Sequence, residues 1–199
     1  MTHVVALSAG YSDPSTSRML ADQLVASIAS KVAEPSVEVV TLRELAHDIT
    51  DATLAGFASP RLQAVIDQVV AADALVVVTP IFKASFTGLF KSFIDALDQD
   101  ALIGKPVLLA AMGGTARHSL AIDHALRPLF AYLQALTVPT GVFASSFDWG
   151  TQGKDALTAR IDRATSELAS LLAGAGTGRG PTDDFDLFSD TMIAASRPD

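Results

Sequence analysis

The chain has 199 residues, a formal net charge of −8 and 49% hydrophobic residues. This length fits one domain with a sizeable core, and the acidic balance without a Lys/Arg-rich block disfavours nucleic-acid binding. The lack of cysteine excludes disulfides, a thiol nucleophile and a cysteine-based metal site. No apolar run is long enough for a membrane span and the N-terminus does not resemble a signal peptide, so we expect no membrane association and a cytoplasmic location.

Five apolar segments predict β-strands, at residues 3–7, 37–42, 74–80, 106–114 and 140–146. Apolar residues recur at the helical period between and after these segments. The apolar stripes are Leu20, Leu24, Val25 and Ile28; Val65, Ile66, Val69 and Val70; Phe86, Leu89, Phe90, Phe93, Ile94 and Leu97; Ile122, Leu126, Leu129, Leu133 and Leu136; and Leu157, Ile161, Ala164, Leu168, Leu171 and Leu172. The alternation predicts an α/β fold: a flavodoxin-like, doubly wound, five-stranded parallel sheet in the order 2-1-3-4-5, with helices on both faces.

The composition changes near the C-terminus. We expect residues 1–173 to form the domain and residues 174–199 to form a Gly-rich linker and an acidic tail. The tail carries Phe185 and Phe188 among aspartates. Two interpretations remain open, a disordered tail and an arm that docks these rings on another subunit.

In open α/β sheets, ligands bind at the carboxyl ends of strands where the strand order reverses, which directs attention to the loops after strands 1, 3 and 4. The first loop begins at Ser8 and reaches Ser15, Thr16 and Ser17 at the expected start of a helix. Hydroxyls and free N–H groups there predict an anion pocket, to which Arg18 adds a cation. An ordinary N-cap explains the same residues. The loop contains neither a G-x-G-x-x-G fingerprint nor a P-loop.

The second loop follows an apolar strand that stops at Pro80, because proline cannot continue a central strand. Pro80, Ile81, Phe82 and Lys83 then lie at the sheet edge. We expect them to form a wall for a flat ring with polar edges. The alternative is a plain connection whose Phe82 joins the core.

The third loop contains Gly113, Gly114 and Thr115. Paired glycines let the backbone approach a ligand closely, and Thr115 would cap the next helix. A simple glycine turn is the alternative. The three loops at one switch point together predict a site for a phosphorylated planar cofactor, and FMN fits this description.

The segments TPIFKASFTG (79–88) and GGTARHSLAIDHALRPLF (113–130), with the serine-rich first loop, resemble the NAD(P)H-dependent FMN reductases of two-component flavin monooxygenase systems. The resemblance covers roughly residues 3–172 and is strongest to alkanesulfonate and methanesulfonate FMN reductases. It implies FMN at the three loops, hydride transfer from NAD(P)H, and a partner monooxygenase that receives reduced FMN. The family usually carries Tyr at the position of Phe82. No catalytic acid or base is assigned.

The helix after the glycine pair contains Pro128, which has no N–H for the carbonyl of His124. This predicts local unwinding or a π-bulge. In the resembling reductases, a π-helix lies at a tetramer interface, and His124 aligns with its inserted residue. Leu120 and His124 fall on the face away from the core, so we expect them at the interface of a homo-oligomer, a dimer or a tetramer. An exposed histidine on a solvated face is the alternative.

Two other functions are compatible with these loops. A reductase that keeps FMN bound and reduces quinones, azo dyes or metal oxyanions remains open, as does a non-enzymatic electron carrier. A Ser-His-Asp hydrolase is disfavoured because G-x-S-x-G is absent. His118 and His124 are six residues apart, too far to chelate a metal as neighbours on a helix, so no metal site is expected. Trp149, after the last strand, is assigned to the core or an interface.

Overall fold

A computed structural model describes residues 1–150 and 153–174. Its sheet is parallel and runs in the order β2-β1-β3-β4-β5, with β6 also pairing with β4. The strands are β1 (Thr2–Ser8), β2 (Pro35–Thr41), β3 (Ala74–Pro80), β4 (Pro106–Gly113), β5 (Leu136–Thr137) and β6 (Val142–Ser145). The predicted fold and strand order are confirmed. The expected linker and tail, from residue 175 onward, lie outside the described residues.

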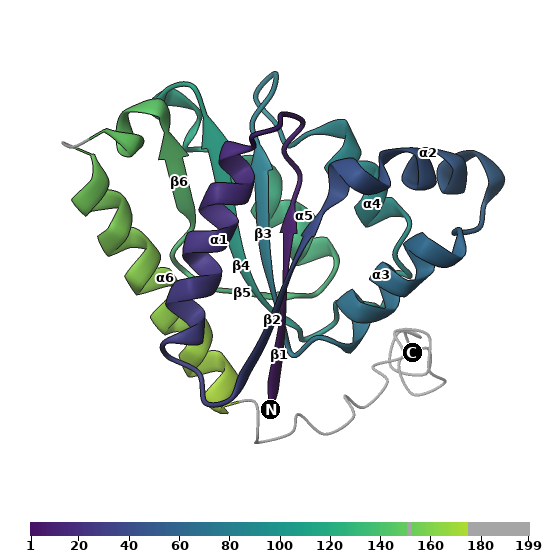
Figure 1. Ribbon diagram of the computed structural model, residues 1–199, viewed down its shortest axis with the longest axis horizontal. Helices are drawn as coiled ribbons and strands as arrows, with labels where there is room; N and C mark the ends of the chain where they lie inside the picture. The colour runs from purple at the N-terminus through teal and green to yellow at the C-terminus, as the bar shows by residue number, and fades with distance from the viewer. Residues whose placement is uncertain (151–152, 175–199) are drawn as a thin grey trace, which may run out of the picture.

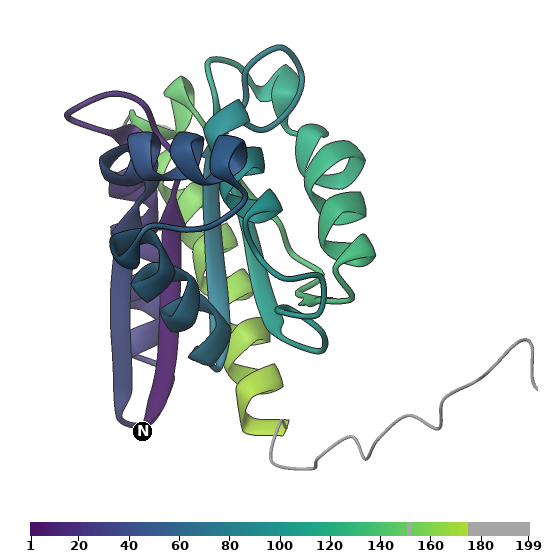
Figure 2. The same cartoon turned by 90° about the vertical axis from the view of Figure 1, so that its right-hand side faces the viewer.

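Helices cover both faces of the sheet. On one face α1 (Thr16–Ala29) and α6 (Lys154–Gly174) lie side by side (Figure 1). The other face carries α2 (Ala46–Ala55), α3 (Pro60–Ala71), α4 (Gly88–Asp95) and α5 (Arg127–Tyr132). Figure 2 views the molecule from the side of α2 and α3, with α6 behind the strands. Among the described residues, no helix combines the length and apolarity needed to cross a bilayer.

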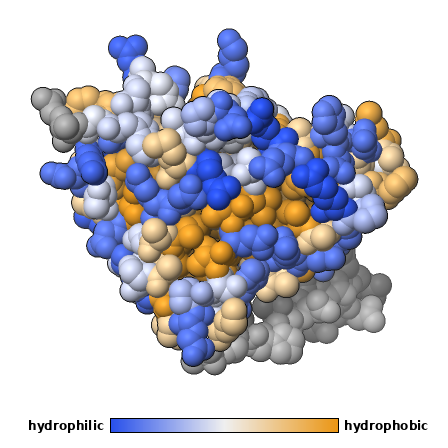
Figure 3. Space-filling model, in the orientation of Figure 1, coloured by the Kyte–Doolittle hydropathy of each residue, from blue (hydrophilic) through white to orange (hydrophobic). Residues whose placement is uncertain are grey.

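The helix starts follow local chemistry. Side-chain oxygens of Ser15, Ser59 and Thr87 accept hydrogen bonds from backbone N–H groups in the first turns of α1, α3 and α4. Such caps satisfy donors that have no partner within the helix. The buried stripes of α1 and α6 then pack on one face of the sheet, while Phe90, Phe93 and Phe130 fill the other. Figure 3 shows apolar surface between these helix groups, over the edge strand β2.

The edge of the sheet beside β4 differs from the expectation. A single fifth strand was predicted at 140–146, but the edge is split into β5 and β6, which pair with opposite ends of β4. Pro139, which cannot donate to a ladder, lies in the gap. Assigning Leu136 to the preceding helix was wrong, because α5 ends at Tyr132 and Gln134 adopts a left-handed φ of 55°. The short helix η1 (Leu42–Leu45) and α2 were not anticipated either.

The predicted π-bulge is confirmed. After the one-turn helix η2 (Ala116–His118), residues Ile122–Leu126 form a π-helix, η3, which leads directly into α5. Pro128 in the first turn of α5 offers no N–H to the carbonyl of His124, so the regular α-helical pattern cannot continue across this turn.

Candidate functional site

The carboxyl ends of β1, β3 and β4 lie next to one another in the sheet, so the three predicted loops meet at the switch point. They enclose a cleft of about 650 Å³, here named the switch-point cavity. Seven of the predicted site residues line it: Thr16, Ser17, Pro80, Ile81, Phe82, Gly113 and Gly114. The fold therefore brings most of the residues predicted from three distant loops to one cleft.

Four predicted residues do not line this cavity. Ser8 is fully buried at the end of β1, and Ser15 is the N-cap of α1. Lys83 is exposed in the β3–α4 loop. Thr115 lines an adjoining cavity and makes no capping hydrogen bond, so its expected capping role is wrong.

The first loop forms a small cradle of hydroxyl groups. A Cβ atom at Gly10 would collide with the Ser15 hydroxyl and lie 3.1 Å from the Ser17 hydroxyl, so the glycine lets these groups close around the backbone. Ser8 Oγ is buried without a hydrogen-bond partner. Hydroxyls at the start of a long helix suit a phosphate group, so these residues fit the phosphate end of FMN.

Arg18 does not behave as the sequence suggested. Its Nε donates to Asp22 at 2.8 Å, and its Nη1 donates to Thr41 at 3.3 Å. The expected extra cation of the anion pocket is therefore held by a carboxylate one turn along α1. Neutral hydroxyl and N–H donors make up the cradle.

The second loop holds Phe82 in an unusual turn. The Phe82 N–H donates to the Ser85 carbonyl at 2.9 Å, and the Ser85 N–H donates back at 3.2 Å. Between them, Lys83 and Ala84 have φ values of 53° and 67°, in the left-handed region that residues other than glycine and asparagine rarely adopt. The Phe82 ring is 51% exposed at the cavity, so the alternative that it joins the core is wrong.

Tyr11 is a site residue that sequence reasoning missed. Its ring contacts Phe82 with centroids 5.7 Å apart, and its hydroxyl accepts a hydrogen bond from the Leu89 N–H at 3.2 Å. Two rings from different loops thus build one wall of the cavity. The signal was present, because Tyr11 is the aromatic residue inside the serine-rich loop.

Trp149, assigned to the core or an interface, also lines the switch-point cavity. Its side chain packs against the core on the α1–α6 face, and its Nε1 atom is buried without a partner. Its position just after β6 places it at the carboxyl edge of the sheet.

The two glycines of the third loop differ in what surrounds them. A Cβ at Gly113 would lie 2.9 Å from the Phe143 ring and 3.1 Å from His118, so packing requires this glycine. Gly114 is exposed, with open space where a Cβ would be, and its carbonyl accepts a hydrogen bond from Ser146 Oγ at 2.9 Å. Gly114 is thus the glycine of this pair whose backbone a ligand can approach.

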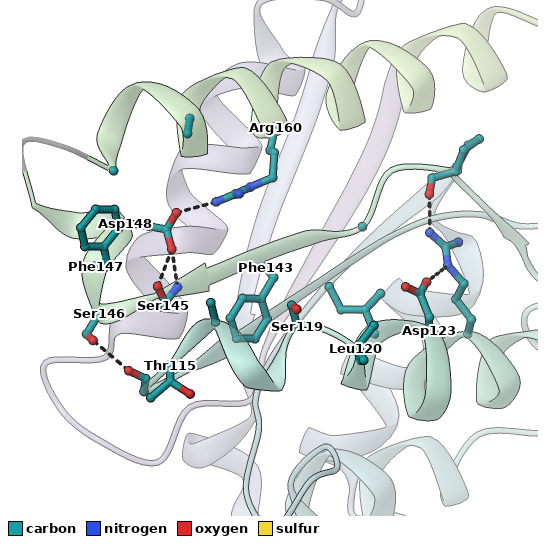
Figure 4. Close-up of a pocket in the computed structure, with 18 residues that line it drawn as sticks. Thr115, Ser119, Leu120, Asp123, Phe143, Ser145, Ser146, Phe147, Asp148 and Arg160 are labelled. Atoms are coloured by element: carbon teal, nitrogen blue, oxygen red, sulfur yellow. Dashed lines mark hydrogen bonds and ion pairs between the residues drawn. The ribbon is translucent and has the colours of Figure 1, made fainter.

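A second cleft of about 820 Å³ adjoins the first and is named here the β6 cavity. It lies between β6 with its following turn η4 (Ser146–Trp149), the start of α6, and the segment from Gly114 to η3 (Figure 4). Gly114 and Ser146 line both cavities, so their hydrogen bond forms a ridge between the two. Leu120 lies on the rim of the β6 cavity and is 62% exposed. His124 is exposed on η3.

Asp148 lines the β6 cavity together with Arg160. It accepts hydrogen bonds from the N–H and the hydroxyl of Ser145, at 2.8 and 2.6 Å, and from Arg160 at 2.5 Å. Burial raises the pKa of Asp148, but the hydrogen bonds from Ser145 and the Arg160 guanidinium outweigh burial and lower this pKa below its ordinary value. Asp148 is therefore ionised at neutral pH.

The sequence matches a family model described as NADPH-dependent FMN reductase over residues 2–150. It is 42% identical to an FMN reductase (NADPH) of Pseudomonas aeruginosa, covering 86% of this chain and 92% of the relative. It is 43% identical to the NADH-dependent FMN reductase SfnE of Pseudomonas putida, covering 87% and 93%. A solved oxidoreductase from Corynebacterium diphtheriae is 44% identical, with a TM-score of 0.83 over 87% of this chain and 98% of that chain. The chain therefore belongs to the NADPH-dependent FMN reductase family, as an oxidoreductase that uses NAD(P)H and FMN.

Proposed function

We propose that this protein reduces FMN in the switch-point cavity with NAD(P)H and supplies the reduced flavin to a partner flavin-dependent monooxygenase. The observation that carries the site is the junction of a hydroxyl-lined helix start and an aromatic wall within one cleft. FMN has a phosphate at one end and a flat ring at the other, which matches this arrangement. When bound there, FMN would supply the redox chemistry by accepting a hydride from the dihydronicotinamide.

Each loop then has a distinct role. Thr16 and Ser17 line the cavity and bind the phosphate through hydroxyls and N–H groups at the start of α1. Ser15, the N-cap of α1, and Ser8, buried at the end of β1, complete the hydroxyl cradle. Gly10 keeps the cradle open.

The remaining loops position the ring. Pro80 and Ile81 form the floor next to β3, and the Phe82–Tyr11 pair forms a wall. Backbone N–H groups near Lys83 and Gly114 would bind the polar edge of the flavin ring and favour its negatively charged form. Holding the two reactants in the correct relative position would supply much of the rate.

The shape of the wall supports exchange of the flavin. Tyr11 and Phe82 are 44% and 51% exposed, and their rings touch, which leaves no room for a third ring between them. A flavin ring bound in this cavity would therefore not be sandwiched between Tyr11 and Phe82. Loose binding suits an enzyme that releases reduced FMN better than an electron carrier.

The test is NADH and NADPH oxidation with and without added FMN, under anaerobic conditions. We expect a rate that depends on added FMN and saturates with it, and reduced flavin that passes through a small-pore membrane. Binding can be followed separately, because Trp149 is the single tryptophan and lines the cavity. Activity that is independent of added FMN but rises with quinone would instead favour the reductase with tightly bound FMN. FMN binding without NAD(P)H oxidation would favour the carrier.

We also propose that the protein forms a homo-oligomer, a dimer or a tetramer, through the exposed face that carries Leu120 and His124. Support comes from the exposure of both side chains on or beside the π-helix and from the exposed Tyr132 ring on α5. Leu120→Ser and His124→Ala should lower the mass measured by light scattering. An unchanged mass in both variants would count against this interface.

A further inference from the structure

The β6 cavity is larger than the switch-point cavity, and the proposed binding of FMN does not use it. It meets the switch-point cavity at the Gly114–Ser146 ridge, so a ligand that spans both cavities must cross this hydrogen-bonded pair. Its volume of about 820 Å³ falls within the usual size of small-molecule sites. Two adjoining cavities suit a ligand made of two parts.

The walls of the β6 cavity are apolar and aromatic. Phe147 is 62% exposed on η4, and Phe143, Ile122 and Leu120 contribute further apolar surface. Figure 4 shows Phe143 between the Ser145–Asp148 side and the Leu120–Asp123 side. An exposed ring beside an apolar floor suits a flat heterocycle, because such rings stack on aromatic faces.

The polar groups of the cavity can hold a neutral sugar. Ser119, Thr115 and Ser146 contribute hydroxyl groups, and Asp148 and Asp123 contribute carboxylates. The Nε of Arg160 is buried without a hydrogen-bond partner. A buried donor without a partner in the protein is consistent with one that a ligand or water completes.

The two cations that line the cavity are already neutralised. Arg160 donates to Asp148 at 2.5 Å, and Arg127 donates to Asp123 at 2.7 Å. Arg127 also donates to the carbonyls of Val138, at 2.9 Å, and Pro139. Within the described part of the chain, the cavity therefore offers no lining arginine or lysine free of a carboxylate for an additional phosphate.

We propose that the β6 cavity binds the adenosine end of the pyridine dinucleotide, and that its carboxylate-paired arginines favour NADH over NADPH. The nicotinamide end reaches across the Gly114–Ser146 ridge to the switch-point cavity. The 2′-phosphate of NADPH meets no unpaired lining cation, because both arginines are held by carboxylates, so it would lose hydration without gaining an ion pair. This inference rests on the proposed function, since it concerns the donor substrate of the same reaction.

A filling variant tests the location. Ala156 is exposed on the first turns of α6 and lines the cavity, whereas Ala159 is exposed on the same helix and does not line it. Ala156→Phe should lower kcat/KM for NADH by about tenfold, within the range for a lost pocket contact. It should leave kcat/KM for reduced nicotinamide mononucleotide unchanged, because that donor lacks the adenosine end. The matched Ala159→Phe should change neither value.

Direct binding separates this inference from the proposed function. Titration of 5′-AMP into the flavin-free protein by calorimetry should show one site, lost in Ala156→Phe and kept in Ala159→Phe. AMP binding without any NAD(P)H oxidation would refute the proposed function and leave the adenosine site standing. FMN-dependent oxidation without an AMP site would overturn the inference. So would an equal loss of kcat/KM for NADH and for reduced nicotinamide mononucleotide in Ala156→Phe. So would a lower oligomer mass in Ala156→Phe alone, because a second copy would then occupy the cavity.

A charge variant tests the coenzyme preference. Asp123→Asn frees Arg127, so kcat/KM for NADPH should rise several-fold relative to NADH. The control is Asp95→Asn, which removes the carboxylate of an equivalent i,i+4 pair with Lys91 on α4, outside the cavity. Wild-type protein that prefers NADPH, or a ratio that shifts equally in both variants, would overturn the assignment of the arginines.

Discussion

The polar groups at the two ends of the parallel sheet differ in whether they have hydrogen-bond partners. At the amino end, Lys105 donates to the carbonyls of Val70, at 3.0 Å, and Ala72, while Asp73 accepts from the His3 N–H at 2.8 Å. At the carboxyl end, Ser8 Oγ and Trp149 Nε1 are buried without partners.

This difference indicates that the polar groups at one end stabilise the fold and that those at the other end belong to the proposed sites. Buried polar groups are normally paired, because an unpaired one costs about 1–3 kcal/mol. Of the four buried side-chain atoms without partners in the described residues, three lie at or beside the two cavities, and Gln68 Oε1 is the exception. The amino end thus uses its polar groups for stability, while the carboxyl end leaves several without a partner in the protein, at or beside the cavities. Variants at the two ends should therefore separate folding stability from flavin binding.

The largest effect is expected at the amino end. Lys105→Met leaves the carbonyls of Val70 and Ala72 without their donor, so the free energy of unfolding should fall by about 2–3 kcal/mol. The Kd for FMN should not change. Urea unfolding and fluorescence titration measure the two quantities, and a weaker flavin affinity without lost stability would reverse the proposed division.

Asp148 lies at the carboxyl end of the sheet, but its hydrogen-bond partners lie within the protein. Its substitution should therefore lower folding stability, as expected for Lys105 at the amino end. Asp148→Asn should cost about 1–2 kcal/mol, because it weakens charged hydrogen bonds with Ser145 and Arg160. Since folding lowers the pKa of Asp148, its contribution is present above the ordinary aspartate range and is lost as the pH falls through the folded-state value. Wild-type and variant stabilities should therefore converge in acid, and a constant difference from pH 7 to pH 2 would contradict this.

Gly10 tests the cradle. Gly10→Ala places a Cβ against the Ser15 hydroxyl, so FMN affinity should fall about tenfold, or ~1.4 kcal/mol. Gly88→Ala is the matched control, because a Cβ there meets nothing within 4 Å and the position is outside the cavity. Equal flavin Kd values in the two variants would remove the cradle from the phosphate site.

Ser8 should show the smallest effect on stability. Its hydroxyl has no partner in the protein, so Ser8→Ala should change the unfolding free energy by less than about 0.5 kcal/mol while weakening FMN several-fold. Ser59→Ala is the opposite case, since it removes the N-cap of α3 and should cost about 1 kcal/mol with no change in FMN affinity. A large stability loss in Ser8→Ala alone would indicate a structural role.

Much of the fold was predictable because local patterns determine it. The run from Ala74 to Pro80 was predicted with its observed bounds, and proline ended it as expected. Pro128 predicted the irregular helix before it. The split between β5 and β6 was missed, because Pro139 interrupts an edge strand whose two halves are defined only by pairing with β4.

The site was predictable in part for the same reason. Hydroxyl-rich and glycine-rich loops can be recognised locally, and the strand order brings them together. The Tyr11–Phe82 contact was not predictable, because it joins residues 71 positions apart through a turn with left-handed backbone at Lys83 and Ala84. The Gly113 prediction had an incomplete basis, since Phe143 and His118, not a ligand, exclude a side chain there.

By itself, the sequence determined the class of fold, the three loops at the switch point and the presence of the π-helix, because each depends on hydrophobic period or on backbone chemistry within a few residues. The tertiary structure decided which groups remain unpaired. Thr41 accepts from Arg18, Asp148 binds Arg160, and Ser146 joins Gly114 to form the ridge between the two cavities. These pairings depend on side-chain distances in the folded chain, which the order of residue types does not reveal.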